Sequence, residues 1–263
     1  MPVVNGMRFP IEVILVCIRW YAAYPLSSRH LEEMMEERGV TVDHSTVSRW
    51  AIRFLSLLEK IFRKYKRPVG GSWRMDETYI KESLIKLITF MVRQAHHERN
   101  QYITVRPKPA EGLNQSFLKV KGVWKYLYRA VDRDGKTIDF LLTAKRDKAA
   151  AKHFFDKAMQ ANGVPEKVTM DKSGANKAAI DEINANREKP MVVRQVKYLN
   201  NIVEQDHRAV KRITKPMLGF KSFQSAKNIL AGIELMHMIR KGQMMMEGAD
   251  KMSFAEQFYA LAE

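Results

Sequence analysis

Three β-rich segments, two of them joined by a tight turn, restrict most strongly what this chain can fold into. Residues 123–131 (VWKYLYRAV) and residues 137–143 (TIDFLLT) are separated by Asp-Arg-Asp-Gly, which favours a hairpin. Residues 73–80 are also strand-like, and Asp76 lies in their middle. A carboxylate within a strand is unfavourable unless something binds it, so Asp76 is a candidate functional residue.

Helices and short strands alternate after the hairpin. The expected elements are a helix at 147–161, a strand at 166–170 that leads to Asp171, a helix at 173–185, a strand at 192–197 and a helix from 200 onward. The succession of strand, hairpin, helix, strand, helix, strand and helix is that of a ribonuclease H-like α/β fold. We therefore predict a mixed sheet with helices on both faces.

Three carboxylates stand at related places in this pattern. Asp76 is on the first strand, Asp171 ends a later strand, and Glu204 is in the first turn of the helix after the last strand. Strand ends meet at one edge of an α/β sheet, so these acids can form one group. Carboxylates that hold two divalent cations can activate a water or a sugar hydroxyl and stabilise a leaving oxygen.

Basic residues accompany the last of these acids. His207, Arg208 and Lys211 follow Glu204 at helical spacing and share its face of the helix. Cations in that position would contact a scissile phosphate or the flanking DNA backbone, and Arg212 extends the basic stretch.

Each acid also has an ordinary structural explanation. Asp171 could cap the helix that follows it, and Glu204 fits a capping box. Asp76 could pair with Arg74 or Lys81. The joint order of the acids, and the cations beside the last one, favour a catalytic site over three separate structural roles.

Residues 10–65 predict helices, and their arrangement resembles a helix-turn-helix. A turn at Gly39 separates the second helix from a third that Asp43 can cap. Two helices joined in this way can place a helix N-terminus in a DNA major groove, although an ordinary helical hairpin is the alternative. The candidate DNA contacts on the third helix are Ser45, Thr46, Ser48, Arg49 and Arg53.

A basic run ends this helical segment, before a Pro-Val-Gly-Gly stretch that is typical of a linker. It can bind phosphates directly after a recognition helix, or it can be a solvated helix end. Its basic residues are Lys60, Arg63, Lys64, Lys66 and Arg67.

The overall charge points to a polyanionic partner. The chain has 45 Lys and Arg against 29 Asp and Glu, a formal net charge of +16. Charge alone does not distinguish nucleic acid from an anionic membrane surface, but the apolar run at residues 11–18 is too short to span a bilayer. The single cysteine, Cys17, excludes a disulfide framework and a Cys-based zinc site.

Longer motifs resemble one known family. They are RWY at 19–21, RGV at 38–40, DHSTV at 43–47, WRMDETY at 73–79, WKYLYRAVD at 124–132, KYLNN at 197–201 and LGFK at 218–221. In this order they resemble DDE transposases of bacterial insertion sequences, specifically the insertion-sequence-six family.

The resemblance implies an enzyme that nicks element ends and joins the freed 3′-hydroxyl to target DNA, usually producing cointegrates. It implies two Mg²⁺ ions, or Mn²⁺, held by Asp76, Asp171 and Glu204, with Lys211 as the basic residue after the last acid. The implied partners are double-stranded terminal-repeat and target DNA and at least a second copy of the chain, since two ends must be synapsed. The implied location is the bacterial cytoplasm at the nucleoid, without a membrane.

The expected domains are a helix-turn-helix domain at residues 1–67, a linker at 68–72, a catalytic domain at 73–243 and a tail at 244–263. Residues 82–119 depart from the family pattern, because a tight hairpin after the first strand needs about 38 residues fewer. Parts of this segment resemble the translation of a bacterial interspersed palindromic repeat.

We expect the insert to form a protruding loop that protease cuts first between residues 94 and 116, and to reduce transposition. A catalytically impaired copy is therefore one alternative to an active transposase. A helix-turn-helix regulator without catalysis is the other.

Overall fold

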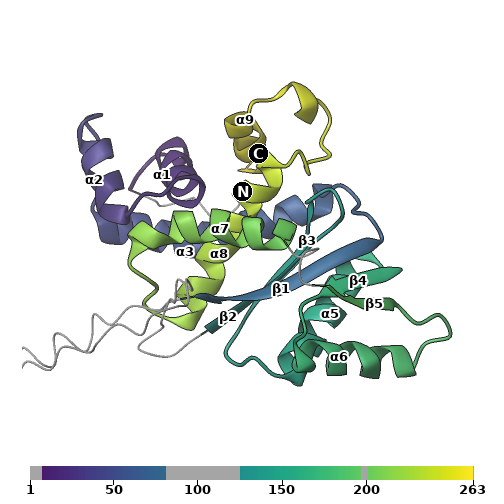
Figure 1. Cartoon of the computed structure of the whole chain (residues 1–263). Coiled ribbons are helices and arrows are strands. Elements are labelled where there is room, and N and C mark those ends of the chain that lie inside the picture. Colours follow the sequence, from purple (N-terminus) through teal and green to yellow (C-terminus); the bar gives the residue numbers. More distant parts are fainter. Residues whose placement is uncertain (1–7, 81–124, 197–200, 263) are drawn as a thin grey trace, which may run out of the picture.

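The computed structural model describes residues 8–80, 125–196 and 201–262 (Figure 1). Its first part contains α1 (Ile11–Ala23), α2 (Ser28–Glu36) and α3 (His44–Phe62), followed by the short 3-10 turn η1 (Arg63–Tyr65). The predicted local signals are present. Gly39 has a φ of 71° in the turn after α2, and the Asp43 side chain accepts hydrogen bonds from the backbone N–H groups of Ser45 and Thr46 at the start of α3.

One mixed sheet follows the helices. It consists of β1 (Ser72–Ile80), β2 (Lys125–Val131), β3 (Thr137–Thr143), β4 (Lys167–Met170) and β5 (Val192–Gln195), in the spatial order β3-β2-β1-β4-β5. β1, β2 and β3 pair antiparallel, whereas β4 pairs parallel to both β1 and β5. The Asp132 carboxylate accepts from the N–H groups of Asp134 and Lys136 in the predicted hairpin turn.

Helices cover both faces of this sheet, which confirms the predicted fold class (Figure 1). α5 (Lys148–Asn162) and α6 (Gly174–Ala185) lie on one face, and the core there includes Trp73, Met75, Tyr128, Phe154 and Ile180. α7 (Asn201–Thr214) and α8 (Phe223–Arg240) lie on the other, where the core includes Leu127, Phe140, Val210, Ile213 and Ile233. Because side chains alternate along a strand, Asp76 belongs to the α7 face and Glu77 to the α5 and α6 face.

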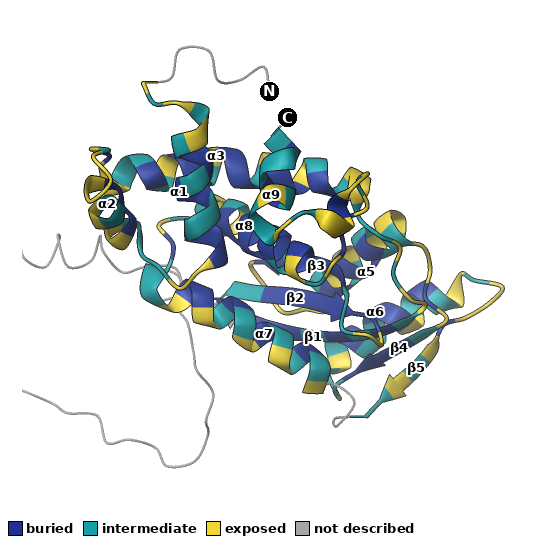
Figure 2. Ribbon diagram, turned by 90° about the horizontal axis from the view of Figure 1, so that it is seen from above, coloured by how far each residue is buried: buried dark blue, intermediate teal, exposed yellow. Residues whose placement is uncertain are grey.

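The helical half is built from both ends of the chain. α8 packs against α3 and is buried along most of its length, as Figure 2 shows. Gly232 of α8 allows this close approach, since a Cβ there would lie 2.7 Å from the Cβ of Leu55.

The last residues add η4 (Ala249–Lys251), α9 (Phe254–Tyr259) and η5 (Ala260–Ala262), after η3 (Lys215–Met217) earlier in the chain. Met244 and Phe258 are buried in the same core as α1, α2 and α3. The domain boundaries stay a prediction, but this apolar core contains residues from both sides of the proposed linker.

The basic run after α3 is partly enclosed by the protein. Arg63 binds the carboxylates of Glu59 and Asp139, the latter at 2.8 Å from Nη2. Lys66 donates to the carbonyl of Ile138 and to the side chain of Asn162. These cations stabilise the junction of α3 with the sheet, whereas Lys60 and Lys64 are exposed. Arg63 thus has a structural role in these ion pairs, and its contact with DNA phosphate stays a prediction.

The predicted insert lies outside the described residues. β1 and β2 pair up to Ile80 and Lys125, on either side of that stretch. Among the helices that the structure describes, none combines the length and apolar character needed to cross a membrane.

Candidate active site

The parallel pairing of β1 with β4 places two of the predicted acids side by side. Arg74 of β1 is in register with Thr169 of β4. Asp76 and Asp171 each follow two residues later in the sequence. Carboxylate oxygens of Asp76, Glu77 and Asp171 all lie within 4.8 Å of one another. The structure thus brings Asp76 and Asp171 together, as predicted, at the point where β4 ends, and adds Glu77.

Glu204 approaches the group from the α7 face of the sheet, the face to which Asp76 belongs. It lies in the first turn of α7, which packs against β1 and β2. Its carboxylate is not among the three that come within 4.8 Å of one another. Its charge nevertheless contributes to the rise in the pKa of Asp76, so Glu204 is within electrostatic reach.

The pKa of Asp76 is strongly perturbed. Burial raises its pKa from 3.8 to about 8, and the negative charges of Glu77, Asp171 and Glu204 add to the rise. Its side chain is still 20% exposed. Hard oxygen ligands that repel one another and retain access to solvent fit Mg²⁺ or Mn²⁺, because a divalent cation removes the repulsion.

Two basic side chains of α7 lie on the Asp76 side. His207 Nε2 is 3.5 Å from Asp76 Oδ2, and burial holds the pKa of this imidazole well below its ordinary value. Burial also lowers the pKa of Lys211, while the carboxylate of Asp76 acts in the opposite direction. Arg208 and Arg212 of the same helix are exposed. His207 was expected beside phosphate, but the structure places it against Asp76 within the protein.

A second set of contacts, which the sequence analysis missed, holds Glu77. Arg146, between β3 and α5, binds Glu77 Oε1, and Asn176 Nδ2 of α6 donates to Oε2 at 2.8 Å. Arg146 Nη2 is also 3.8 Å from Asp171 Oδ2. The position of Glu77 is the sequence feature that indicates these contacts. A second carboxylate directly after Asp76 in a strand must point to the opposite face, and a buried charge there needs a partner.

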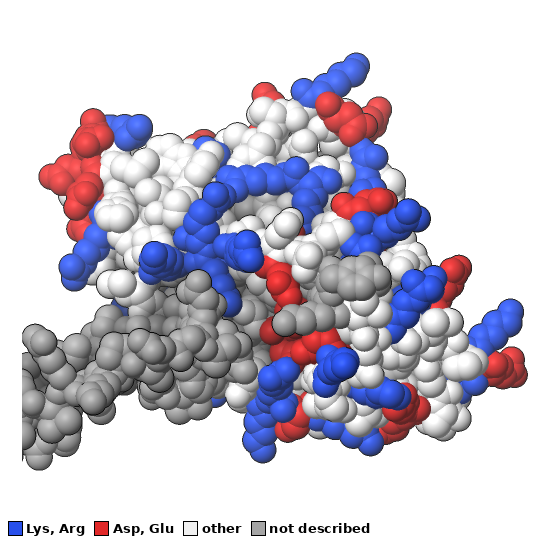
Figure 3. Space-filling view, viewed as in Figure 1, with Lys and Arg blue, Asp and Glu red and all other residues white. Residues whose placement is uncertain are grey.

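Charged groups of both signs lie on the surface of the molecule. Figure 3 shows Asp and Glu side chains gathered near the middle of one face, with Lys and Arg side chains above and below them. This distribution suits a polyanion that must be held beside an acidic metal site.

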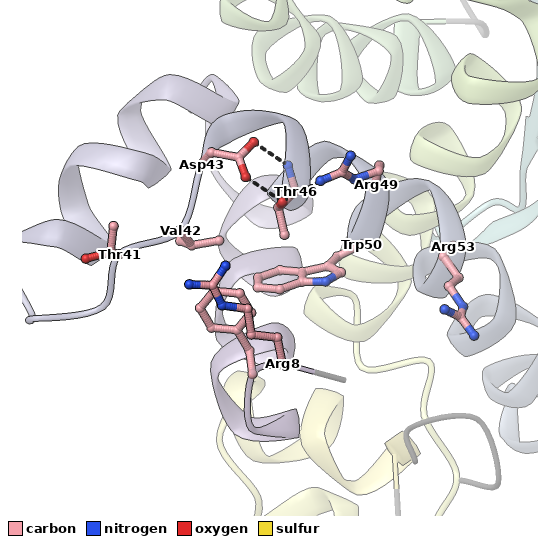
Figure 4. A pocket seen from close by; sticks show the side chains of 9 residues that line it. Arg8, Thr41, Val42, Asp43, Thr46, Arg49, Trp50 and Arg53 are labelled. Carbon is pink, nitrogen blue, oxygen red and sulfur yellow. Dashed lines mark hydrogen bonds between the residues drawn. The ribbon is translucent and has the colours of Figure 1, made fainter. Parts of the chain in front are cut away.

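Helix α3, the predicted recognition helix, carries a separate cationic surface. Arg49 and Arg53 are exposed, and they border a pocket of about 460 Å³ together with Arg8, which precedes α1 (Figure 4). Trp50 lines this pocket, and its ring packs edge-to-face on Phe9 with a centroid distance of 5.2 Å.

The polar residues at the start of α3 serve the helix cap. Asp43 binds the N–H and hydroxyl groups of both Ser45 and Thr46, and Arg49 Nη2 donates to Thr46 Oγ1 at 2.6 Å. Ser48, the remaining predicted contact, is partly exposed. Arg8 was missed because no periodic or capping signal surrounds it in the sequence.

The chain is similar in sequence to known transposases. The family model described as a DDE domain, of the IS240 transposase type, matches residues 111–243. The transposase for insertion sequence-like element IS431mec of Staphylococcus aureus is 35% identical over 236 residues, which cover 89% of this chain and 87% of that protein. The Staphylococcus aureus transposase for insertion sequence element IS257 in transposon Tn4003 is 34% identical with the same coverage.

Among solved structures, the Mos1 strand transfer complex is 12% identical, with 98% of this chain and 78% of that chain covered and a TM-score of 0.37. The family model and the two staphylococcal relatives decide the assignment. With that similarity along most of its length, and with Asp76 and Asp171 together where β4 ends, this chain belongs to the family of bacterial insertion-sequence DDE transposases.

Proposed function

We propose that this transposase binds the terminal repeats of its element and cleaves and joins DNA strands at Asp76, Asp171 and Glu204. The observation that carries the proposal is the proximity of Asp76 and Asp171, with the pKa of Asp76 raised to about 8. Such crowding is unfavourable in an empty site and is relieved by a bound cation. Two divalent ions, when bound, would supply an activated hydroxyl and stabilise the leaving oxygen.

The other residues have separate proposed roles. Lys211 contacts the phosphate beside the acids, and His207 packs against Asp76 without taking a charge. The proposed phosphate and base contacts of the DNA are Arg8, Ser45, Thr46, Ser48, Arg49, Arg53, Lys60, Arg63, Lys64, Arg208 and Arg212. Because two element ends must be joined, the working form is a homodimer or a higher oligomer, and DNA binding keeps it at the nucleoid.

Strand transfer with a DNA fragment that carries the element ends tests the catalytic role. Asp76→Asn, Asp171→Asn and Glu204→Gln should each abolish Mg²⁺-dependent cleavage and joining, and each should keep terminal-repeat binding because α3 is untouched. Asp181→Asn is the matched control, since Asp181 is an exposed acid paired with Lys177 on α6. Normal joining by any one of the three variants would remove that residue from the site.

The same assay separates an active enzyme from an impaired copy. A chain that binds the ends but joins strands only after deletion of residues 82–119 is an enzyme impaired by its insert. A chain that binds the ends and never cleaves them, with or without that segment, is a DNA-binding regulator.

A further inference from the structure

Glu77 lies close to the other acids of the site but is buried within the protein. Its carboxylate lies within 4.8 Å of those of Asp76 and Asp171, so by distance alone it is a candidate metal ligand. Its side chain, however, is only 2% exposed, against 20% for Asp76 and 37% for Asp171. It also points to the α5 and α6 face of the sheet, away from Glu204 and α7.

Both oxygens of Glu77 already have partners within the protein. Oε1 binds the Nε and Nη2 groups of Arg146, and Oε2 accepts a hydrogen bond from Nδ2 of Asn176 at 2.8 Å. Asn176 is fully buried. A buried carboxylate with a guanidinium and an amide in place is electrostatically compensated, and taking up a cation would require these bonds to break.

Arg146 lies between two acids of the site. Its Nη2 is closely bound to Glu77 Oε1 and 3.8 Å from Asp171 Oδ2. Asp171 Oδ1 accepts from the backbone N–H of Ser173 at 3.1 Å, so Oδ2 is the oxygen that faces the guanidinium. Since an arginine is always charged, its position decides how strongly it competes with a cation for Asp171.

We infer that Glu77 is a positioning residue and not a metal ligand: it holds Arg146 on the α5 and α6 face and thereby leaves Asp171 available to the cation. Asn176 fixes the orientation of the Glu77 carboxylate. The inference rests on the proposed metal-dependent function. Among the described residues, Asp171 is the other carboxylate that forms an ion pair with Arg146. Without the charge of Glu77, the guanidinium moves toward Asp171 and occupies the ligand that the metal needs.

A charge-neutral double variant separates positioning from ligation. Mn²⁺ binding to the full chain without DNA is measured by calorimetry for the original protein, Glu77→Gln, Arg146→Gln and Glu77→Gln/Arg146→Gln. We expect Glu77→Gln to bind Mn²⁺ at least about tenfold more weakly, in the range found for residues that support metal ligands. We expect the double variant to return to within about threefold of the original affinity, because the competing guanidinium is gone.

A metal-ligating role for Glu77 predicts a different result. If Glu77 ligates the metal, the double variant binds as weakly as Glu77→Gln, and the inference is wrong. Asp171→Asn serves as the reference for a lost ligand and should bind weakly whether or not Arg146→Gln is added. A purely structural role for Glu77 would lower thermal stability in Glu77→Gln without any recovery of Mn²⁺ affinity in the double variant.

Two further outcomes keep the proposals distinct. If Glu77→Gln does not fold, the double variant, which buries no unpaired charge, decides alone: affinity near the original supports positioning, and a tenfold loss contradicts it. If the original protein binds no Mn²⁺, the metal-dependent function fails, and the inference fails with it. Mn²⁺ binding by the original protein together with a weak double variant contradicts only the inference.

Discussion

Arg129 of β2 forms an ion pair with Glu234 of α8, with Nε and Oε1 2.7 Å apart and neither side chain exposed. Arg129 Nη2 is also 3.2 Å from Asp206 Oδ2 on α7, two residues after Glu204. In the ladder between β1 and β2, Arg129 stands opposite Asp76. One buried cation therefore connects both helices of this face to β2, the strand that pairs with the one carrying Asp76.

Removal of one member of this pair should strongly destabilise the protein. Among the described residues, Glu234→Leu leaves Asp206 as the remaining ion-pair partner of the buried Arg129. The loss is expected to be about 3–5 kcal/mol in the free energy of unfolding. Urea denaturation measures it. Asp181→Leu, which removes an exposed pair with Lys177, should change stability by less than about 1 kcal/mol. A similarly small change for Glu234→Leu would mean that the buried pair does not support the fold.

The raised pKa of Asp76 predicts how stability depends on pH. Between the ordinary pKa of 3.8 and the folded value of about 8, the folded chain keeps a proton that the unfolded chain releases. The contribution of Asp76 is fully present below about pH 4 and decreases as pH rises through about 8. Metal-free protein should therefore lose unfolding free energy between about pH 5 and about pH 8.

Asp76→Asn is the control for this effect, because asparagine has no proton to release. The difference in unfolding free energy between the original protein and this variant, both measured in a chelator, should change steadily across that pH range. A difference that is independent of pH would show that Asp76 titrates normally in the folded chain.

The contact between α3 and α8 predicts a steric effect at Gly232. A Cβ at this position would lie 2.6 Å from Leu55 Cδ1 and 2.7 Å from Leu55 Cβ, and the latter atom cannot rotate away. Gly232→Ala should therefore destabilise the protein by about 1–3 kcal/mol, although alanine favours a helix. Gly174→Ala in α6 is the matched control, since nothing lies within 4 Å of its added Cβ. Equal stability of the two variants would contradict the close packing.

The cationic pocket beside α3 predicts two kinds of DNA-binding defect. Arg8→Ala should weaken binding to terminal-repeat and random DNA equally and lower the salt slope by about one, as for a phosphate contact. Arg49→Ala should weaken binding to the terminal repeat by about 1–3 kcal/mol more than binding to random DNA, as for a base contact. Fluorescence anisotropy at several salt concentrations measures both. Lys148→Ala, at an exposed pair with Glu182, should change neither.

Much of the fold could be predicted because its signals are local. The Asp43 cap, the turn that contains Gly135 and the strand around Asp76 each depend on neighbouring residues. The strand expected at residues 166–170 is β4 (Lys167–Met170). Topology then predicted that Asp76 and Asp171 would meet, because the ends of parallel strands lie together.

What escaped prediction depends on partners that are distant in the sequence. Arg129 and Glu234 are 105 positions apart, and Arg63 reaches Asp139 across 76. A basic residue after a helix looks the same whether it meets phosphate or a buried carboxylate. Arg146 likewise carries no sequence signal for the acids that it bridges, since its loop position is set by β3 and α5.

The packing of α8 and the final residues onto α1, α2 and α3 affects how this protein is made. A ribosome synthesises the first three helices long before it reaches Met244 and Phe258, so those helices cannot complete their core until these later residues have been made. A message that stops before α8 would yield helices with an exposed apolar face and not a free DNA-binding fragment. The proposed binding of element ends and the proposed cleavage of them therefore both depend on residues made after α8 has been synthesised.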